Sequence, residues 1–417
     1  MNKAFKFRLY PNKTQRELVA KTFGCTRFIY NKMLSDKIEH YEKTEKMLNN
    51  TPAQYKAEYE WLKEVDSLAL ANAQISPILF CIKHMCYFRL ERCCAAERSR
   101  SYSNTFNANS LNNAYKNFYR NKNSGYPKFK SKKGSRKSYT TNMVNGNIQL
   151  EEGYIKLPKL SMVKIKQHRE VPEGYILKAV TVSQSATGKY YASVLFEYET
   201  NIETIDPEIF LGLDYSMKEL FVSSDGRSAE YPGYYRRSLE KLRKEQRKLS
   251  KCQKKSKNRN KQRLKVAKLH EKVSNQRKDY LHKLSRQIAN AVDVVCIEDL
   301  NMKGMSKALN FGKSVSDNSF GNFTRILDYK LKDLGKQLVK IDKWFPSSKM
   351  CSECGNVKDL LPLSERIYHC DACGTTMDRD HNASRNIRNE GMRMVLGYSH
   401  QDTTVGHTGI ARLCCSH

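Results

Sequence analysis

The sequence predicts a multidomain α+β protein in which a helical domain, a small β-barrel and an α/β domain with an inserted metal-binding ribbon share one chain. Three observations predict this fold class. The 417 residues are too many for one ordinary core, so we expect two to four domains. The pattern changes along the chain from helical periodicity to short alternating strands, and then to buried strands separated by helices. Four cysteines late in the chain have the spacing of metal ligands.

The composition indicates a nucleic-acid partner. The formal net charge is +31, the pI is near 9.6 and the mean hydropathy is −0.70. A charge so far from zero opposes compaction unless an anion offsets it. Because no acidic tail neutralises it within the chain, the expected anion is nucleic acid.

No segment indicates secretion or a membrane. The N-terminal run MNKAFKFRLYPNKTQ lacks the apolar core of a signal peptide, and apolar runs such as Val294 to Ile297 are too short to span a bilayer. We therefore expect a cytoplasmic protein without a membrane partner. In that compartment the thirteen cysteines are expected to be reduced, as packing residues or metal ligands.

The first elements along the chain are a strand and a helical region. Residues 3–10 alternate in period two and predict a strand, which Pro11 ends. From Thr14 to about Ala114 apolar residues recur at helical spacing, so we expect a helical domain over residues 11–140.

Residues 115–140 differ in character, because Gly and Pro interrupt the helical pattern while Lys and Arg alternate with Tyr and Phe. Cations for phosphates combined with aromatic rings for bases are typical of a nucleic-acid surface. A solvated linker is the alternative interpretation. The candidate phosphate contacts in this stretch are Lys128, Lys130, Lys132, Lys133, Arg136 and Lys137.

Several short strands follow between Gln149 and Thr200, with glycines at the turns between them. They predict a small antiparallel barrel. The strand at residues 3–10 is a candidate to complete it, which gives a barrel domain of residues 1–10 and 141–205.

A third region is predicted to be an α/β domain formed by residues 206–345 and 376–392. Its run IFLGLDYS is a buried strand, with ELFVSSDGRSAEY as hairpin partner and SDG as the turn, and VDVVCIEDL is a second buried strand. Residues 324–338 predict a helix, and QLVKIDKWF predicts a further strand.

Between the two buried strands, residues 235–287 predict a basic helical hairpin that faces nucleic acid. The lysine-rich middle, Lys251 to Lys261, is predicted to be the loop between its helices. The candidate phosphate contacts here are Lys251, Lys254, Lys255, Lys257 and Arg259.

The four late cysteines predict one structural zinc site. Cys351, Cys354, Cys370 and Cys373 form two C-x2-C pairs, and two such turns offer four thiolates to one tetrahedral Zn²⁺. We assign residues 346–375 to a zinc ribbon, and we expect residues 393–417 to be a flexible C-terminal tail.

Three acids predict a second, harder metal site. Asp214 and Glu298 terminate buried strands, where a carboxylate is costly unless it binds something, and Asp380 follows the last zinc ligand. This order of elements is that of the ribonuclease H-like (RNase H-like) fold, in which three distant carboxylates meet at two Mg²⁺ ions. Oxygen ligands select Mg²⁺ or Mn²⁺, whereas thiolates select zinc. Asp299 and Asp378 are reserves that should point away, because each is offset from its neighbour along the chain.

The motifs resemble the transposon-encoded TnpB family and its relatives, the compact type V CRISPR effectors and the eukaryotic Fanzor proteins. The similar runs are LGLDYS, VVCIEDL followed by NMKGM, and FPSSKMCSECG…YHCDACGTTMDRDHNASRNI. The opening FKFRLYPNKTQRELVAKTFGCTRFIYNKML is similar too, so the resemblance covers about residues 1–390. One mild departure is the tyrosine in GLDYS, where many members have a small residue.

The resemblance implies an RNA-guided DNA endonuclease with a helical recognition domain, a wedge barrel and a RuvC-like nuclease domain. Its partners would be a guide RNA from the transposon end and double-stranded target DNA beside a short motif, and one or two copies would bind the RNA. The catalytic, Mg²⁺-binding acids would be Asp214, Glu298 and Asp380. Three alternatives remain: a nuclease-inactive guided repressor, an RNA-independent transposase and a plain zinc-ribbon RNA-binding protein.

Overall fold

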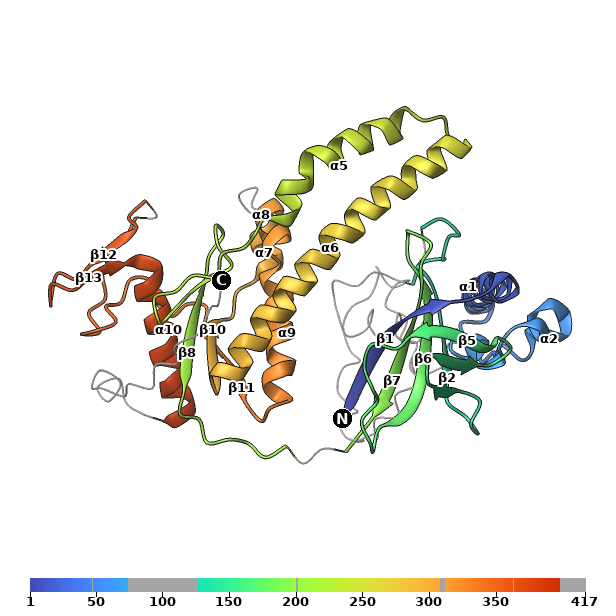
Figure 1. The fold of residues 1–417 in the computed structure, drawn as a ribbon, viewed down its shortest axis with the longest axis horizontal. Helices are drawn as coiled ribbons and strands as arrows, with labels where there is room; N and C mark the ends of the chain where they lie inside the picture. Colours follow the sequence, from blue (N-terminus) through green and yellow to red (C-terminus); the bar gives the residue numbers. More distant parts are fainter. Residues whose placement is uncertain are drawn as a thin grey trace. The chain divides into compact units, whose positions relative to one another are not determined.

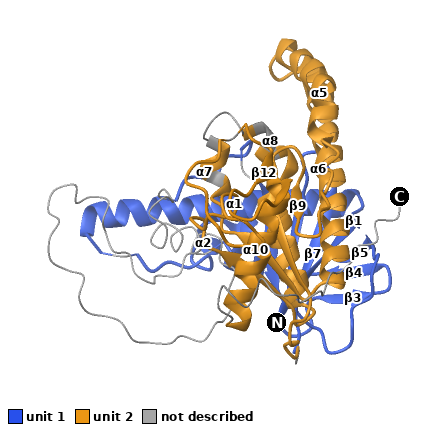
Figure 2. Cartoon of the chain, turned by 90° about the vertical axis from the view of Figure 1, so that its left-hand side faces the viewer, with its two compact units in different colours: residues 1–200 blue, residues 201–417 orange. Residues whose placement is uncertain are grey.

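The computed structural model describes residues 1–46, 48–73, 127–134, 136–199, 202–307, 312–362 and 364–397. The chain forms two compact units, residues 1–200 and 201–417, which Figure 2 shows in different colours. Within the described ranges, no helix is both long enough and apolar enough to cross a membrane.

Unit 1 is built on a seven-stranded antiparallel sheet with the strand order β2-β6-β7-β1-β5-β4-β3 (Figure 1). The N-terminal strand lies between two strands from much later in the sequence, which confirms that it joins this sheet. The strands are β1 (Asn2–Tyr10), β2 (Lys137–Asn142), β3 (Gln149–Glu151), β4 (Tyr154–Leu157), β5 (Ser161–Lys166), β6 (Ile176–Gln184) and β7 (Tyr190–Glu197).

One hydrophobic core serves this whole sheet. Its members come from strands on both sides of β1, and they include Phe7, Ile155, Val180 and Val194, each with no exposed surface. Along strands such as β1 and β4, they alternate with more exposed residues, as predicted for half-buried strands.

Helix α1 (Lys13–Thr44) also packs on this core. It begins at an Asn12 capping box, in which the Asn12 side chain and that of Gln15 satisfy each other's backbone N–H groups. The short helices α2 (Tyr55–Glu58), η1 (Glu60–Glu64) and α3 (Ser67–Ala71) follow. The remainder of the predicted helical stretch, and the aromatic residues at 115–126, lie outside the described residues.

Unit 2 contains a four-stranded sheet with the order β11-β10-β8-β9. Strands β8 (Phe210–Tyr215), β10 (Val294–Glu298) and β11 (Gln337–Ile341) are parallel, and β9 (Phe221–Ser223) runs antiparallel to β8. The two strands predicted to end in acids are therefore direct neighbours, which confirms their place in an α/β sheet.

Helices cover both faces of this sheet (Figure 1). On one face, α6 (Lys257–Ala291) and α9 (Phe320–Lys332) pack against Leu211, Leu213 and Val295. On the other face, α10 (Arg379–Leu396) packs against Phe210 and Val294. The sheet therefore separates two cores, and α10 is the helix that covers the second in the described part of the chain.

The basic hairpin is formed by α5 (Tyr234–Lys251) and α6, which lie side by side (Figure 1). Its loop is shorter than predicted, because α6 already begins at Lys257, where the Ser256 side chain caps it. Short helices α7 (Met302–Lys307) and α8 (Gly312–Asn318) precede α9, and β12 (Ile367–His369) pairs with β13 (Thr376–Asp378) in the ribbon.

Other boundaries differ from the prediction too. The sheet of unit 1 already begins at Lys137, where β2 pairs with β6 inside the range predicted for the helical domain. The helix expected at residues 324–338 begins earlier, at Phe320, and ends at Lys332, because the chain turns at Gly335 with a positive φ of 73° before β11. Helix α10 continues to Leu396 and ends at Gly397, so residues 393–396 of the expected tail are helical. Residues 398–417 lie outside the described residues.

Candidate functional site

The alternation of β8 and β10 places two acids on the same face of the sheet. In β8, Leu211 and Leu213 face α6 and α9, so Asp214 faces α10. In β10, Val295 and Ile297 face α6 and α9, so Glu298 also faces α10. Because the two strands are parallel neighbours, both carboxylates lie at the same carboxyl edge of the sheet.

Two glycines let α10 lie close to this face. A Cβ atom at Gly212 would lie only 2.0 Å from the backbone oxygen of Ser384, and one at Gly391 would lie 2.1 Å from Sγ of Cys296. Helix and sheet therefore touch through backbone where a side chain would hold them apart. This close packing brings the first turn of α10 to the edge that carries Asp214 and Glu298.

Asp380 lies in that first turn. The preceding Asp378 is the N-cap, and its Oδ1 accepts hydrogen bonds from the N–H groups of Asp380 at 2.9 Å and His381 at 3.0 Å. The Asp380 side chain is one-third exposed and lies 3.8 Å from an Arg366 guanidinium nitrogen. Asp378 thus builds the helix start, and Asp380 is free to face the acids of the sheet.

Burial raises the pKa values of all three acids, and repulsion by the other two adds to this at Asp214. Burial raises the pKa of Asp214 well above its usual range, and the charges of Glu298 and Asp380 raise it further. Burial also raises the pKa of Glu298, although a hydrogen bond from Ser347 opposes this. The pKa of Asp380 is raised first by burial and then by the charge of Asp378. The raised pKa values mean that these carboxyl groups bind protons more readily. A cation bound in place of the protons would relieve the repulsion between the charges, and carboxylate oxygens are hard donors that suit Mg²⁺ or Mn²⁺.

The three acids are spaced more widely than the four cysteines. Among the described residues, the four cysteines are the one group of three or more potential ligands whose ligand atoms all lie within 4.8 Å of one another. The three carboxylates are therefore spread more widely.

The two reserve acids have other contacts. Asp299 directly follows Glu298, so its side chain faces the opposite side of the sheet, and it forms an exposed ion pair with Lys340 at 2.8 Å. Asp378 is occupied as the N-cap of α10. Both contacts agree with the expectation that these side chains point away.

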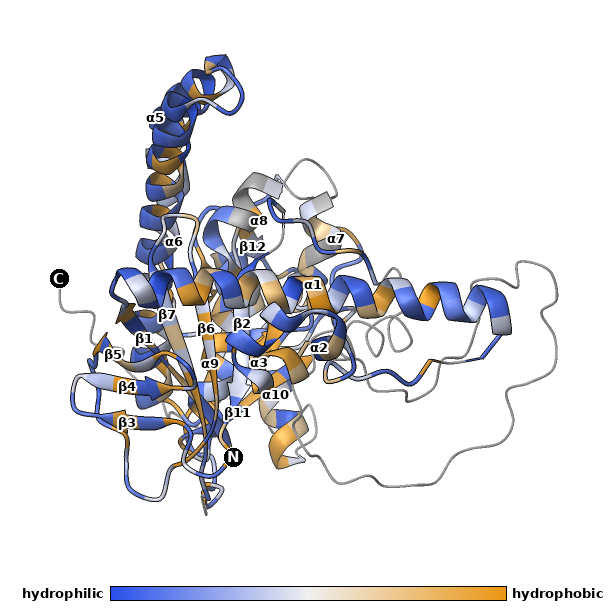
Figure 3. Cartoon of the chain, turned by 90° about the vertical axis from the view of Figure 1, so that its right-hand side faces the viewer, coloured by the Kyte–Doolittle hydropathy of each residue, from blue (hydrophilic) through white to orange (hydrophobic). Residues whose placement is uncertain are grey.

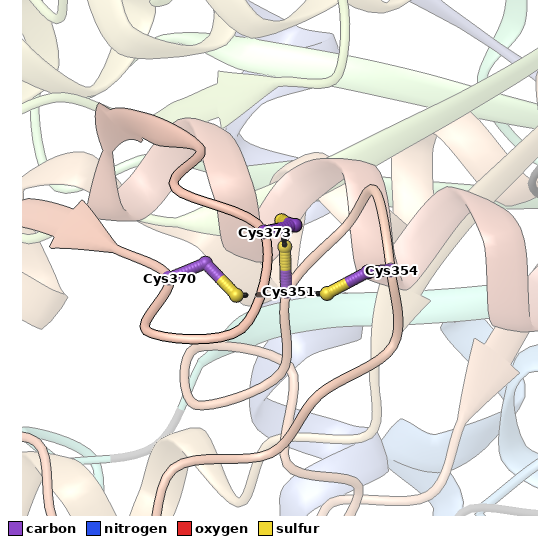
Figure 4. Close-up of side chains that lie close together, drawn as sticks. All are labelled: Cys351, Cys354, Cys370 and Cys373. Atoms are coloured by element: carbon purple, nitrogen blue, oxygen red, sulfur yellow. Dashed lines mark hydrogen bonds between the residues drawn. The ribbon is translucent and has the colours of Figure 1, made fainter.

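The four cysteines form a compact cluster with their sulfur atoms directed toward one another (Figure 4). The Sγ atoms of Cys351 and Cys373 are 3.7 Å apart, and those of Cys354 and Cys370 are 3.5 Å apart. A zinc tetrahedron with bonds of about 2.3 Å has sulfur–sulfur edges of about 3.8 Å, so the cluster fits this ion. Hydrogen bonds from Thr375 lower the pKa of Cys373 to about 6, which favours the thiolate.

Polar side chains of α10 form hydrogen bonds with the backbone at the start of the ribbon. The sequence analysis did not predict these contacts. Asn382 donates to the Met350 oxygen at 2.7 Å and accepts from the Ser352 N–H at 3.0 Å. Asn386 donates to the Ser347 oxygen at 2.8 Å. The i, i+4 spacing of the two asparagines was visible in the sequence, but backbone partners cannot be identified from it.

The predicted phosphate contacts differ in exposure. In unit 1 the exposed candidates are Lys128, Lys132, Lys133, Arg136 and Lys137. Lys130 is different, because its ammonium lies 3.7 Å from the centre of the Tyr30 ring and burial lowers its pKa to about 8. In the hairpin, Lys251, Lys254, Lys255 and Lys257 are exposed, whereas Arg259 donates to the backbone oxygens of Leu249 and Cys252 and so closes the turn.

The basic face predicted for the hairpin includes a stripe along α5, and only Lys251 of this stripe was among the candidate contacts. Along α5, one hollow face is lined mainly by cations at helical spacing, and Figure 3 shows that α5 is mostly hydrophilic. The lining cations are Arg243, Lys244, Arg247, Lys248 and Lys251. The i, i+4 recurrence of Lys and Arg was the signal that could have identified it.

Family comparisons match three parts of the chain. Residues 193–309 match a family described as "Probable transposase", and residues 320–387 match the "Cas12f1-like, TNB domain". Residues 1–46 match a "Helix-turn-helix domain", although here they form strand β1 and one long helix, α1.

Curated proteins match nearly the whole chain. A "Putative RNA-guided DNA endonuclease" of Streptomyces pristinaespiralis is 32% identical over 94% of this chain and 90% of its own length. The "Putative RNA-guided DNA endonuclease InsQ" of Escherichia coli (strain K12) is 29% identical over 92% of this chain and 91% of its own length.

One solved structure shares the fold. The protein in the "Cryo-EM structure of the Cas12f1-sgRNA-target DNA complex" aligns with a TM-score of 0.53, at 14% identity, over 93% of this chain and 98% of that chain. This likeness confirms the predicted fold class, in which helices, a separate sheet and an α/β domain with a cysteine ribbon share one chain.

Proposed function

Because the chain belongs to the family of TnpB-like RNA-guided DNA endonucleases, we propose that it binds a guide RNA from a transposon end and cuts double-stranded DNA that matches this guide. Recognition of a short motif beside the target would precede base pairing to the guide. The chain is a DNA-cleaving enzyme. We propose that it acts on DNA in the cytoplasm of a prokaryotic cell.

The observation that carries this proposal is the placement of the acids. Asp214 and Glu298 share one face of the sheet, and Asp380 begins the helix that covers this face. Their pKa values are all raised, and Asp214 is influenced by the charges of both others. Such a set of partly buried carboxylates, in which the other two charges act on Asp214, supports a role as ligands of two Mg²⁺ or Mn²⁺ ions.

The side chains have separate tasks in this proposal. The bound ions would supply an activated water and stabilise the leaving 3′ oxygen of the cut strand. The ligands of these ions would be Asp214 and Glu298, from two neighbouring strands, and Asp380, from the first turn of α10. Zinc on the four cysteines would keep the ribbon folded beside α10, where Asn382 and Asn386 anchor it.

The charge distribution supports binding of RNA and the guide–target hybrid. The protein needs many phosphate contacts and few base contacts if base pairing reads the target. The stripe on α5, the exposed lysines of the hairpin loop and the exposed cations at residues 128–137 are the surfaces we assign to phosphates. Whether one or two copies bind one RNA is a further property to measure.

The test uses the purified protein with the RNA that it carries. That RNA is sequenced, and a plasmid library presents the matching site beside randomised sequence. We expect cutting with Mg²⁺, none with EDTA and none after RNase treatment. The Asp214→Ala protein should bind the matched DNA without cutting it, whereas the control Asp299→Ala should cut normally.

Each alternative result has a clear meaning. Cleavage that survives RNase would indicate an RNA-independent transposase. Matched binding without cleavage by the unaltered protein would indicate a guided repressor. Cleavage by Asp214→Ala would refute the catalytic assignment.

A further inference from the structure

A serine outside the three acids holds one of them. Oγ of Ser347 donates a hydrogen bond of 2.5 Å to Oε1 of Glu298. Ser347 lies in the loop between β11 and the cysteine ribbon, and it is only 6% exposed. A buried hydroxyl that donates to a half-buried carboxylate at this distance forms a strong, charge-assisted bond.

The loop that carries Ser347 is itself fixed to α10. The Nδ2 atom of Asn386 donates to the backbone oxygens of Ser347 at 2.8 Å and Met350 at 2.6 Å. Asn382 donates a second bond to the Met350 oxygen, and both asparagines are almost fully buried. Because Asp380 begins the same helix, α10 determines both where Asp380 lies and where the Ser347 hydroxyl points.

We propose that Ser347 is a positioning residue of the nuclease site, which holds one oxygen of Glu298 and leaves the other for a divalent ion. This inference rests on the proposed function. The loop before the ribbon would then have two roles, because it joins β11 to the ribbon and also orients a ligand of the nuclease site. A carboxylate held in this way presents one orientation, so binding of the ion does not first have to order it.

A purely structural role is the competing interpretation. In that case the hydroxyl would only satisfy a buried acceptor, and its loss would lower stability without changing metal binding. The two roles predict different results for metal affinity at constant fold. Metal affinity, measured apart from cleavage, is therefore the discriminating quantity.

The experiment compares Ser347→Ala and Ser347→Thr with the unaltered protein, each bound to its RNA. Mn²⁺ binding is measured by electron paramagnetic resonance without DNA, and the half-saturating Mg²⁺ concentration is measured for cleavage. Loss of such a supporting contact costs about 10- to 100-fold in metal affinity. The Mn²⁺ dissociation constant and the half-saturating Mg²⁺ concentration should therefore both rise by this factor in Ser347→Ala. Thr keeps the hydroxyl and should restore both.

Ser348→Ala is the matched control, because it removes a hydroxyl from the next residue of the same loop and should leave both quantities unchanged. Melting temperatures are recorded for every variant, and Ser347→Gly repeats the deletion should the alanine variant not fold.

Unchanged Mn²⁺ affinity in the folded deletion variant would overturn the proposal, and so would equal losses in Ser347→Ala and Ser347→Thr. Failure of the proposed function is separable from both results, because it would appear as absent cleavage in the unaltered protein, whose Mn²⁺ binding is measured independently.

Discussion

Gly212 controls how closely α10 approaches the sheet, and its replacement by alanine is the sharpest steric test of the site. The added Cβ would lie 2.0 Å from the backbone oxygen of Ser384 and 2.7 Å from the backbone nitrogen of Arg388. Real Cβ atoms essentially never come within 3.0 Å of such atoms, so the helix must retreat by at least about 1 Å. Both obstructing atoms are backbone, so no side-chain rotation can relieve the contact.

The retreat would separate Asp380 from Asp214, since Asp380 lies in the first turn of the displaced helix. A misplacement of about 1 Å in a catalytic site can cost about 100-fold in rate. Overpacking of this kind also destabilises by about 1–3 kcal/mol. We therefore expect Gly212→Ala to fold with a lower melting temperature and to cut matched DNA about 100-fold more slowly in single turnover.

The matched control is Gly24→Ala in α1, where an added Cβ would meet no atom within 4 Å. This variant should cut normally and be slightly more stable, because alanine favours a helix by about 1 kcal/mol over glycine. A Gly212→Ala protein that cuts within about threefold of the unaltered rate would refute the reasoning. It would mean that the position of α10 does not determine the geometry of the site.

Three further predictions follow from the metal ligands and the basic surfaces. We expect the unaltered protein to carry one zinc ion per chain, as measured with a chromogenic chelator. Cys370→Ser should lose this zinc and cut more slowly, whereas Cys252→Ser should retain it; equal zinc in both variants would contradict a zinc site at the cysteine cluster. The pKa of Asp214 is raised in the folded state above its ordinary 3.8, so the stability of the metal-free protein should fall as pH rises from about 4 toward the folded pKa. Asp214→Asn should remove this fall, as measured by urea unfolding with EDTA. Identical pH profiles of the two proteins would count against burial of the Asp214 charge. Replacing Lys251, Lys254 and Lys255 by Ala should weaken RNA binding. The slope of the logarithm of the binding constant against the logarithm of the salt concentration should become less steep by about 0.7–0.9 for each lost phosphate contact. Lys340→Ala, which removes an ion pair with Asp299, should not change this slope, and an unchanged slope in the triple variant would show that these lysines do not contact RNA.

The sequence was sufficient for those parts of the site that depend on period and spacing. Alternation along IFLGLDYS and VVCIEDL fixes which face Asp214 and Glu298 share once both are known to be buried parallel strands. The C-x2-C pairs need only two tight turns to form a cluster. The family resemblance supplied the late acid on a helix, and that residue lies in the first turn of α10.

The remaining features depend on long-range contacts that no local pattern encodes. Ser347 and Glu298 are 49 residues apart, and their hydrogen bond follows from how the loop before the ribbon lies on α10. Lys130 was chosen for its charge, yet its position over Tyr30 removes it from water. The short hairpin loop follows from the Ser256 cap, which starts α6 inside a lysine-rich run that reads as a loop.

The placement of divalent ions tests the central claim most directly. Diffraction at the manganese absorption edge, from the protein bound to its RNA and matched DNA in Mn²⁺, should show two peaks about 3.5–4 Å apart. We predict that oxygens of Asp214, Glu298 and Asp380 surround them. Peaks bound elsewhere, or three carboxylates that stay too far apart to share the ions, would contradict the account.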